Sequence, residues 1–204
     1  MRIIAGDWRG RKLAEPRGKE TTRPTTDRVR EACASMVEAA REEGICGARV
    51  LDAFAGSGAM GMEMLSRGAA HATFCDSDRG AAQLVRKNLA ALSCAPARFD
   101  VLGTDSYQLG ARGPVPGAPF DVVILDPPYA DAGEDVAAMV SRLQRSGLLA
   151  REALVLYEHA SRDDSPRIDG FELYRHKRYG ITAVDLFAAR STQQSQAGSE
   201  DPCA

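Results

Sequence analysis

The chain has 204 residues, of which 44% are hydrophobic and 26% are charged. This is enough apolar material for one core but too little for two large domains, and the charge content is that of a globular protein. The sequence contains no apolar run of about eighteen residues, and its start lacks the apolar stretch of a signal peptide. We therefore expect a cytoplasmic protein that neither enters a membrane nor is secreted. Five cysteines without a C-x-x-C pair indicate neither a disulfide framework nor a metal site.

The net charge of −2 hides an asymmetry along the chain. Residues 1–30 carry nine Lys or Arg and four acidic residues, a net +5, and the remaining 174 residues carry a net −7. A basic arm on an acidic body is typical of a protein that docks a polyanion at one end. The charge pattern alone leaves open a merely solvated arm.

The first elements belong to this basic segment. Residues 2–5 and 11–14 form two short apolar runs around glycines, which predicts a small β-hairpin. Residues 15–24 contain Pro and Gly and are predicted to form a loop. Thr26 and Asp27 then precede apolar residues at three- and four-residue spacing, which predicts a helix to about Glu43. We expect residues 1–46 to form an N-terminal extension.

From residue 48 onward, short apolar runs alternate with helical patterns. We expect strands at 50–54, 72–75, 97–102, 120–125 and 153–157, with helices at 59–67, 80–92 and 135–144. This alternation predicts an α/β fold with a mostly parallel, Rossmann-like sheet covered by helices. The last two strands, at 171–178 and 182–188, are separated only by a turn at Gly180 and are therefore expected to pair antiparallel. The sheet would have seven strands within a catalytic domain at 47–190, followed by a disordered tail at 191–204.

The first candidate site is the glycine loop D-A-F-A-G-S-G-A-M-G at residues 52–61, which contains G-x-G-x-x-G between a strand and a helix. Glycines let a ligand approach the backbone closely, and the helix start offers unpaired N–H groups. Asp76 follows the next strand, twenty residues after Gly56, where an acidic residue can hold ribose hydroxyls. The pattern predicts a site for an adenosine-bearing ligand, with Phe54, Gly56, Ser57 and Gly58 in its wall.

Asp52 helps to identify the ligand. Its carboxylate would repel the pyrophosphate of a dinucleotide and attract the sulfonium and ammonium groups of S-adenosylmethionine. We therefore expect S-adenosylmethionine as the cofactor and S-adenosylhomocysteine as its product. Asp105, after the third strand, is placed to reach the adenine amino group.

The second candidate site is Asp126-Pro127-Pro128-Tyr129, directly after the strand at 120–125. Ligands of open α/β sheets bind at the carboxyl ends of the strands, which places this tetrad beside the glycine loop. Asp126 and the carbonyl of Pro127 can accept the two hydrogens of an exocyclic amine, and Tyr129 can stack on a flipped base. The tetrad thus predicts methyl transfer to a base amine.

Several segments resemble one known family: residues 8–13 (W-R-G-R-K-L), 23–31 (R-P-T-T-D-R-V-R-E), 54–59 (F-A-G-S-G-A), 65–69 (L-S-R-G-A) and the tetrad. They are similar to those of the bacterial methyltransferases that modify N2 of guanine 966 in small-subunit (16S) ribosomal RNA. The resemblance implies a seven-stranded methyltransferase fold, S-adenosylmethionine as donor, and an N-terminal arm that helps to dock RNA.

Within that arm we expect two sets of RNA-binding residues. Arg9, Arg11 and Lys12 would contact phosphates from the hairpin. Arg23, Arg28 and Arg30 would border the active cleft. The expected partner is ribosomal RNA within the small subunit or its assembly intermediate, because RNA is usually recognised through shape and unpaired bases. We expect the protein to act as a monomer.

Other functions remain open at this stage. The same chemistry on adenine N6 of RNA or DNA is the nearest alternative, and a non-catalytic RNA-binding assembly factor is a second. A nicotinamide-dependent reductase would use the glycine loop but would explain neither Asp52 nor the tetrad. His71, His159 and His176 have no partner spacing for catalysis and are expected to be structural.

Overall fold

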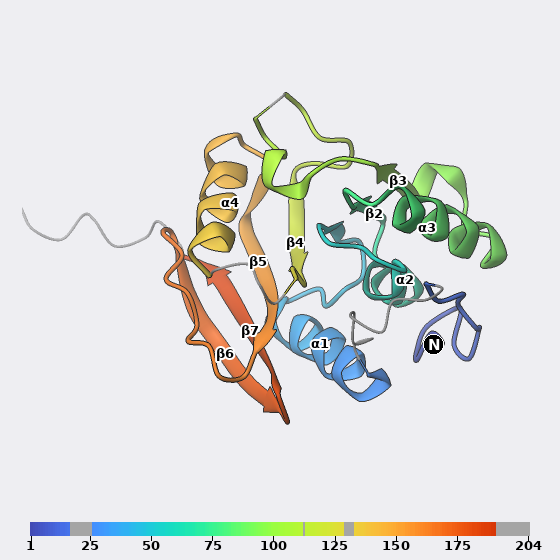
Figure 1. Cartoon of the computed structure of the whole chain (residues 1–204), viewed down its shortest axis with the longest axis horizontal. Helices are drawn as coiled ribbons and strands as arrows, with labels where there is room; N and C mark the ends of the chain where they lie inside the picture. Colours follow the sequence, from blue (N-terminus) through green and yellow to red (C-terminus); the bar gives the residue numbers. More distant parts are fainter. Residues whose placement is uncertain (17–25, 112, 129–132, 191–204) are drawn as a thin grey trace, which may run out of the picture.

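The computed structural model describes residues 1–16, 26–111, 113–128 and 133–190. Within them, seven strands form one sheet in the order β3-β2-β1-β4-β5-β7-β6 (Figure 1). The strands are β1 Arg49–Asp52, β2 His71–Cys75, β3 Phe99–Leu102, β4 Phe120–Leu125, β5 Leu149–Ala160, β6 Phe171–Tyr179 and β7 Thr182–Ala189. The helices are α1 Asp27–Ala40, α2 Ala59–Ser66, α3 Arg79–Ala91 and α4 Gly133–Arg145, with short 3₁₀ turns η1 Pro96–Arg98 and η2 Ser106–Gln108.

The strand pairing confirms the predicted topology. Strand β1 pairs parallel with β2 and β4, and the parallel arrangement continues outward to β3 and β5. Strand β7 runs antiparallel to both β5 and β6. The turn at Gly180, whose φ is +64°, is too short for a crossover helix, so β7 must fold back on β6.

Several predicted boundaries were wrong by a few residues. Strand β5 begins at Leu149 rather than at 153 because the exposed Arg151 and Glu152 lie within the strand and interrupt its apolar pattern. Strand β3 begins at Phe99 because Pro96 opens a 3₁₀ turn instead. Helix α1 ends at Ala40 because the backbone turns to an extended conformation at Arg41.

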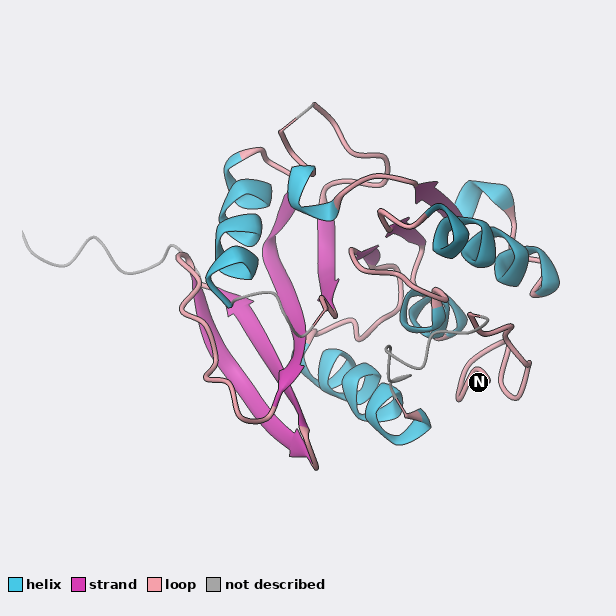
Figure 2. Cartoon of the chain, in the orientation of Figure 1, coloured by secondary structure: helices cyan, strands magenta, loops and turns pink. Residues whose placement is uncertain are grey.

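Helices cover both faces of the sheet (Figure 2). On one face, α1, α2 and α3 pack through residues such as Cys33, Met62 and Val85 against Val50 and Phe74 of the sheet. On the other face, α4 packs alone, and its buried side chains are Val136, Met139, Val140 and Leu143. Because both faces are covered, the central strands are apolar on both sides, which is why they appear as continuous apolar runs in the sequence.

The N-terminal arm forms a shorter hairpin than predicted. Residues 1–16 contain one isolated antiparallel bridge, between Arg2 and Lys12, rather than two strands. The strand cannot continue because the N–H groups of Ile4 and Ala5 donate to the carboxylate of Glu63 on α2, at 2.8 and 3.1 Å. The two ends of the arm pair only over residues 1–3 and 10–13, where Ile3 donates to the Arg11 carbonyl and Leu13 to the Met1 carbonyl, and the arm then docks on α2.

The arm also approaches α2 through its backbone. Asp7 donates its N–H to the carbonyl of Ser66 at 2.8 Å, and the neighbouring Gly6 has a φ of +79°. A Cβ atom at Gly6 would lie 1.8 Å from that same carbonyl oxygen, so only glycine fits there. Ile3 and Leu13 belong to the same buried cluster as residues of β1 and β2.

Two further expectations concern the limits of the chain and membranes. The tail at 191–204 lies outside the described residues, and the domain division near residue 46 stays a prediction. In the described part of the chain, the helices are too short or too polar to cross a membrane.

Candidate active site

Three predicted site residues, Asp52, Asp76 and Asp126, lie where neighbouring strands of the sheet end. In the parallel register, Asp52 at the end of β1 lies beside Phe74 of β2 and Ile124 of β4. The carboxyl ends of these three strands are therefore adjacent, and the loops that follow them form one edge.

The glycine loop after β1 uses its glycines in two ways. Gly56 and Gly58 have φ angles of +54° and +78°, which favour glycine over other residues. A Cβ at Gly58 would lie 2.8 Å from the side chain of Met62, so this position is packed. Among the described atoms, a Cβ at Gly56 would meet nothing within 4 Å. Gly56 is therefore the point of the loop that a ligand can approach closely.

Asp52 lies beneath this loop and is only 3% exposed. Its Oδ2 accepts a hydrogen bond from the N–H of Gly61 in the first turn of α2, at 2.9 Å. Burial raises the pKa of Asp52 to about 7; the Gly61 hydrogen bond acts to lower this pKa, and the charges of Asp126 and Asp76 raise it further. The carboxyl group is thus poised between its charged and neutral forms near neutral pH.

Asp76 connects the glycine loop to the start of α3. Its Oδ2 accepts from the N–H of Gly56 and its Oδ1 from the N–H of Asp78, both at 2.8 Å. Each oxygen keeps a second lone pair, and the side chain is partly exposed. Asp76 can therefore hold the loop and accept hydrogen bonds from a ligand at the same time.

Asp105 lies in the loop after β3 and caps the turn η2, because its Oδ1 accepts from the N–H of Tyr107 at 2.9 Å. The loop is anchored to the end of β1 in two places. The Ser106 hydroxyl donates to the Ala53 carbonyl, and the Tyr107 ring meets Phe54 edge-on at 5.4 Å between centroids. Asp105 is exposed next to these contacts. Sequence reasoning missed Ser106 and Tyr107, which immediately follow Asp105.

The acceptor tetrad follows β4. Asp126 is exposed and Pro127 is buried, whereas Tyr129 lies outside the described residues. The charge of Asp126 acts on both Asp52 and Cys33 of α1, so Asp126 lies near the donor loop and near that helix. Burial raises the pKa of the Cys33 thiol, and the charges of Glu158 and Asp126 raise it further, so this cysteine stays protonated and inert.

The predicted RNA-binding cations have different surroundings. Arg9, Lys12 and Arg28 are exposed, and Arg11 is exposed while its Nη2 donates to the Ala91 carbonyl at the end of α3 at 2.5 Å. Arg23 lies outside the described residues.

The placement of Arg30 is a correction. Its side chain is 2% exposed, and its Nη2 donates to the Arg2 carbonyl at 2.8 Å and to Asp27 Oδ1 at 2.7 Å. Because the guanidinium is buried against the arm, it is not available to an RNA phosphate in this conformation.

Comparison with known proteins identifies the family. The family model described as "Conserved hypothetical protein 95" matches residues 1–188. The chain belongs to this family. The chain is 37% identical over 198 residues to "Ribosomal RNA small subunit methyltransferase D" of Escherichia coli, covering 97% of this chain and 94% of that protein. It is 32% identical over 191 residues to "Putative rRNA methyltransferase YlbH" of Bacillus subtilis, covering 93% and 100%.

A solved structure agrees. The putative methyltransferase yhhF of Escherichia coli superposes with a TM-score of 0.79 at 37% identity, covering 94% of this chain and 99% of that one. The fold of this chain is the seven-stranded fold of class I methyltransferases, as predicted.

In this member of the protein 95 family, Asn88 joins the arm to the donor loop. Asn88 is 1% exposed; its Oδ1 accepts from the Ala14 N–H, and its Nδ2 donates to the carbonyls of Ala14 and Ser57, at 2.9 to 3.1 Å. Sequence reasoning missed this residue. Its position between Val85 and Leu92 on the apolar face of α3 could have marked it as a buried polar group that needs partners.

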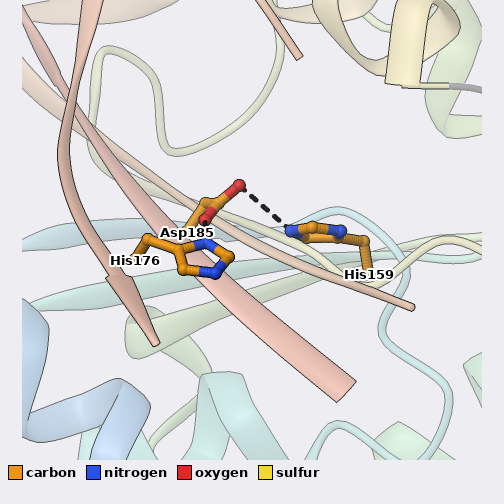
Figure 3. Close-up of side chains that lie close together, drawn as sticks. All are labelled: His159, His176 and Asp185. Carbon is orange, nitrogen blue, oxygen red and sulfur yellow. Dashed lines mark hydrogen bonds and ion pairs between the residues drawn. The ribbon is translucent and has the colours of Figure 1, made fainter. Parts of the chain in front are cut away.

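A second polar cluster holds the C-terminal strands together (Figure 3). Asp185 of β7 is fully buried; its Oδ2 lies 3.0 Å from His159 Nε2 of β5, and its Oδ1 lies 2.6 Å from His176 Nδ1 of β6. Burial acts to raise the pKa of Asp185, but hydrogen bonds from His159, Ser165 and His176 hold this pKa below its ordinary value. These ligand atoms lie within 4.8 Å of one another and are of the types that could hold a metal ion. They are already hydrogen-bonded to each other, which agrees with the structural role predicted for both histidines.

Proposed function

We propose that this chain transfers the methyl group of S-adenosylmethionine to the exocyclic N2 of a guanine in small-subunit ribosomal RNA. The observation that carries the proposal is the position of Asp126 and Pro127 at the end of β4, next to the glycine loop at the end of β1. The names of the relatives, which are ribosomal RNA methyltransferases, support the substrate class. The guanine and its N2 atom rest on the resemblance in the sequence motifs.

S-adenosylmethionine is the methyl donor, and when bound it supplies an electrophilic methyl group on a sulfonium. The residues present fit this cofactor. The backbone at Gly56 is open to a ligand, and the N-terminus of α2 offers N–H groups to the part of the donor that lies beside the loop. Asp76 is assigned to accept hydrogen bonds from the ribose hydroxyls. Asp105 is assigned to the adenine amino group, and Phe54, Ser57 and Gly58 to the wall of the site. Asp52 places negative charge beneath the cationic end.

At the acceptor site, the chain's own groups orient the amine. Asp126 and the Pro127 carbonyl each accept one amine hydrogen, which turns the nitrogen lone pair toward the methyl group. Transfer would form the N–C bond at the expense of the donor's C–S bond, with the neutral thioether as the leaving group, and Asp126 or water would take the amine proton. Tyr129 is assigned to stacking on the base.

The reaction is tested with tritiated S-adenosylmethionine and three substrates from cells that lack the enzyme: small subunits, free 16S RNA and DNA. Label in RNA, recovered after digestion as N2-methylguanosine, is the expected result. N6-methyladenosine would support the adenine alternative. Donor binding without transfer to any substrate would support a non-catalytic assembly factor. We expect the active species to be a monomer, which a sedimentation measurement on the same preparation checks.

A further inference from the structure

Strand β6 carries an unusual row of charge at the edge of the sheet. It is the outermost strand beyond β7, and Arg175, His176, Lys177 and Arg178 are consecutive and exposed. Charged residues on an edge strand also protect against aggregation, so the row alone does not indicate a site. The decisive question is therefore what the row faces.

The carboxyl end of the row lines a groove of about 530 Å³ against helix α1. Arg28, Glu31 and Ser35 line it from the helix, and Lys177, Arg178 and Tyr179 line it from the strand. Three cations thus line the groove together with one carboxylate, and Ala32 adds a small apolar patch. A groove of this composition suits a phosphate backbone better than an apolar segment of a protein.

The groove borders the acceptor site through helix α1. Positions 28, 31, 32 and 35 lie on the groove side of the helix, whereas Cys33 lies on its buried side. The charges of Asp126 and of Glu158 act on Cys33, so the buried side of α1 lies near the tetrad while other positions of the same helix line the groove. In Figure 1 the arrowhead of β4 points toward α1, and β5 and β7 pass beside it.

Arg178 is held in a defined orientation. Its Nε donates to His176 Nε2 at 3.3 Å, and the other ring nitrogen of His176 lies 2.6 Å from the buried Asp185. Because His176 Nε2 accepts a hydrogen bond from the Nε–H of Arg178, Nδ1 carries the ring proton and donates a hydrogen bond to Asp185. Through Arg178, the polar cluster between the C-terminal strands extends to the wall of the groove.

We propose that this groove binds the phosphate backbone of the RNA strand whose base enters the Asp126 site, through Arg28, Lys177 and Arg178. This inference rests on the proposed function and adds a surface to it. The C-terminal strand β6 contacts the substrate on the side of α1, separately from the N-terminal arm. Methylation of one base requires phosphate contacts close to the reacting site, because these contacts fix the register of the bound strand.

The test compares two triple variants with the same change in charge. The groove variant is Arg28→Gln, Lys177→Gln and Arg178→Gln. The control is Arg145→Gln, Arg151→Gln and Arg190→Gln, three exposed arginines at the other end of the C-terminal strands, where α4 ends, β5 begins and β7 ends. Binding of a 16S RNA transcript is measured across a salt series, and binding of S-adenosylmethionine is measured by calorimetry.

We expect the groove variant to bind RNA at least tenfold more weakly and to lower the slope of log affinity against log salt by about 2, at about 0.7–0.9 per lost phosphate contact. The control should change the slope by less than half as much, and donor affinity should be unchanged in both. Equal losses in the two variants would overturn the groove assignment while leaving the methyl transfer intact. If the unaltered protein binds small subunits but not the transcript, the two triple variants are compared on subunits with the same criterion. If it binds neither, the proposed function fails together with the groove proposal.

A single substitution provides a test in the opposite direction. Glu31 is the one carboxylate among the residues that line the groove. Glu31→Gln should therefore increase RNA affinity about two- to threefold at low salt without changing donor affinity. A decrease in RNA affinity in this folded variant would contradict a phosphate-binding groove.

Discussion

Asp52 makes donor binding sensitive to pH. Burial raises the pKa of Asp52 to about 7 in the free protein, and a bound cation favours the charged carboxylate. The complex therefore holds Asp52 at a lower pKa, and a proton is released when the donor binds. The affinity for S-adenosylmethionine should rise as pH increases from 6 to about 7 and level off above pH 8. Calorimetry in buffers with different ionisation enthalpies measures the released proton directly.

The matched controls for this prediction are a ligand and a variant. S-adenosylhomocysteine lacks the sulfonium charge and should show a weaker pH dependence over the same range. Asp52→Asn keeps the size of the side chain but cannot ionise, and its donor affinity should be independent of pH in this window. A pH dependence that persists in Asp52→Asn would exclude Asp52 as its source.

Asp126 has a different role and should give a different response. Asp126→Ala removes one acceptor for the substrate amine, and we expect kcat to fall at least a hundredfold while donor affinity changes less than threefold. The same change removes a negative charge that raises the pKa of Asp52, so the pH midpoint of donor binding should move downward. Methyl incorporation and the pH series on one preparation check both effects. Equal losses in kcat and in donor affinity would argue against an acceptor-site role.

At the scale of elements, the docking of the arm can be tested with two glycines. Gly6 and Gly10 have φ angles of +79° and +80°, but a Cβ at Gly6 meets the Ser66 carbonyl, whereas among the described atoms one at Gly10 meets nothing within 4 Å. Gly10→Ala should lower the free energy of unfolding by about 1–2 kcal/mol, the cost of the backbone conformation alone. Gly6→Ala should cost more than this because the arm must leave α2. Urea unfolding of the two variants checks the difference, and equal costs would show that the close contact is unimportant.

The elements differ in how well the sequence predicts them. Strand β4 was predicted within its exact bounds because a strand buried on both faces is a continuous apolar run ended by Asp-Pro-Pro. The extent of the arm's hairpin was predicted wrongly, because its pairing stops where Ala5 bonds to Glu63, a residue 58 positions away that nothing local reveals. Tertiary contacts of this kind override local strand patterns.

The site shows the same division. The carboxylates after β1, β2 and β4 could be placed together from the strand order alone, since parallel strands end at one edge. Whether a cation is available to RNA could not be predicted, because Arg30 and Arg28 are two positions apart and one is buried while the other is exposed. The cationic residues of β6 could be assigned to a strand from the sequence. The groove that they line could not be predicted, because it forms only where α1 lies beside that strand.

At the scale of the whole molecule, Asp185 connects the C-terminal strands and influences acid stability. Its folded pKa lies below the ordinary value, so its contribution to stability is present above about pH 4 and is lost as pH falls through the lowered value. Asp185→Asn should lower the free energy of unfolding at pH 7 by about 3 kcal/mol, because two histidines lose a charged partner. It should also make that free energy less dependent on pH between 5 and 3. Urea unfolding at several pH values tests this, and parallel curves for the two proteins would contradict it.

The hydrogen bonds of Asn88 also affect how substitutions in the arm are interpreted. One buried side chain bonds both Ala14 of the arm and the Ser57 carbonyl of the donor loop, so a shift of either segment strains or breaks a contact of the other. When RNA binding shifts the arm, it therefore also changes the affinity for the donor, and by linkage donor binding changes the affinity for RNA by the same factor. An arm variant selected for a change in substrate preference would therefore also carry an altered apparent affinity for the methyl donor. The two constants have to be measured as one thermodynamic cycle.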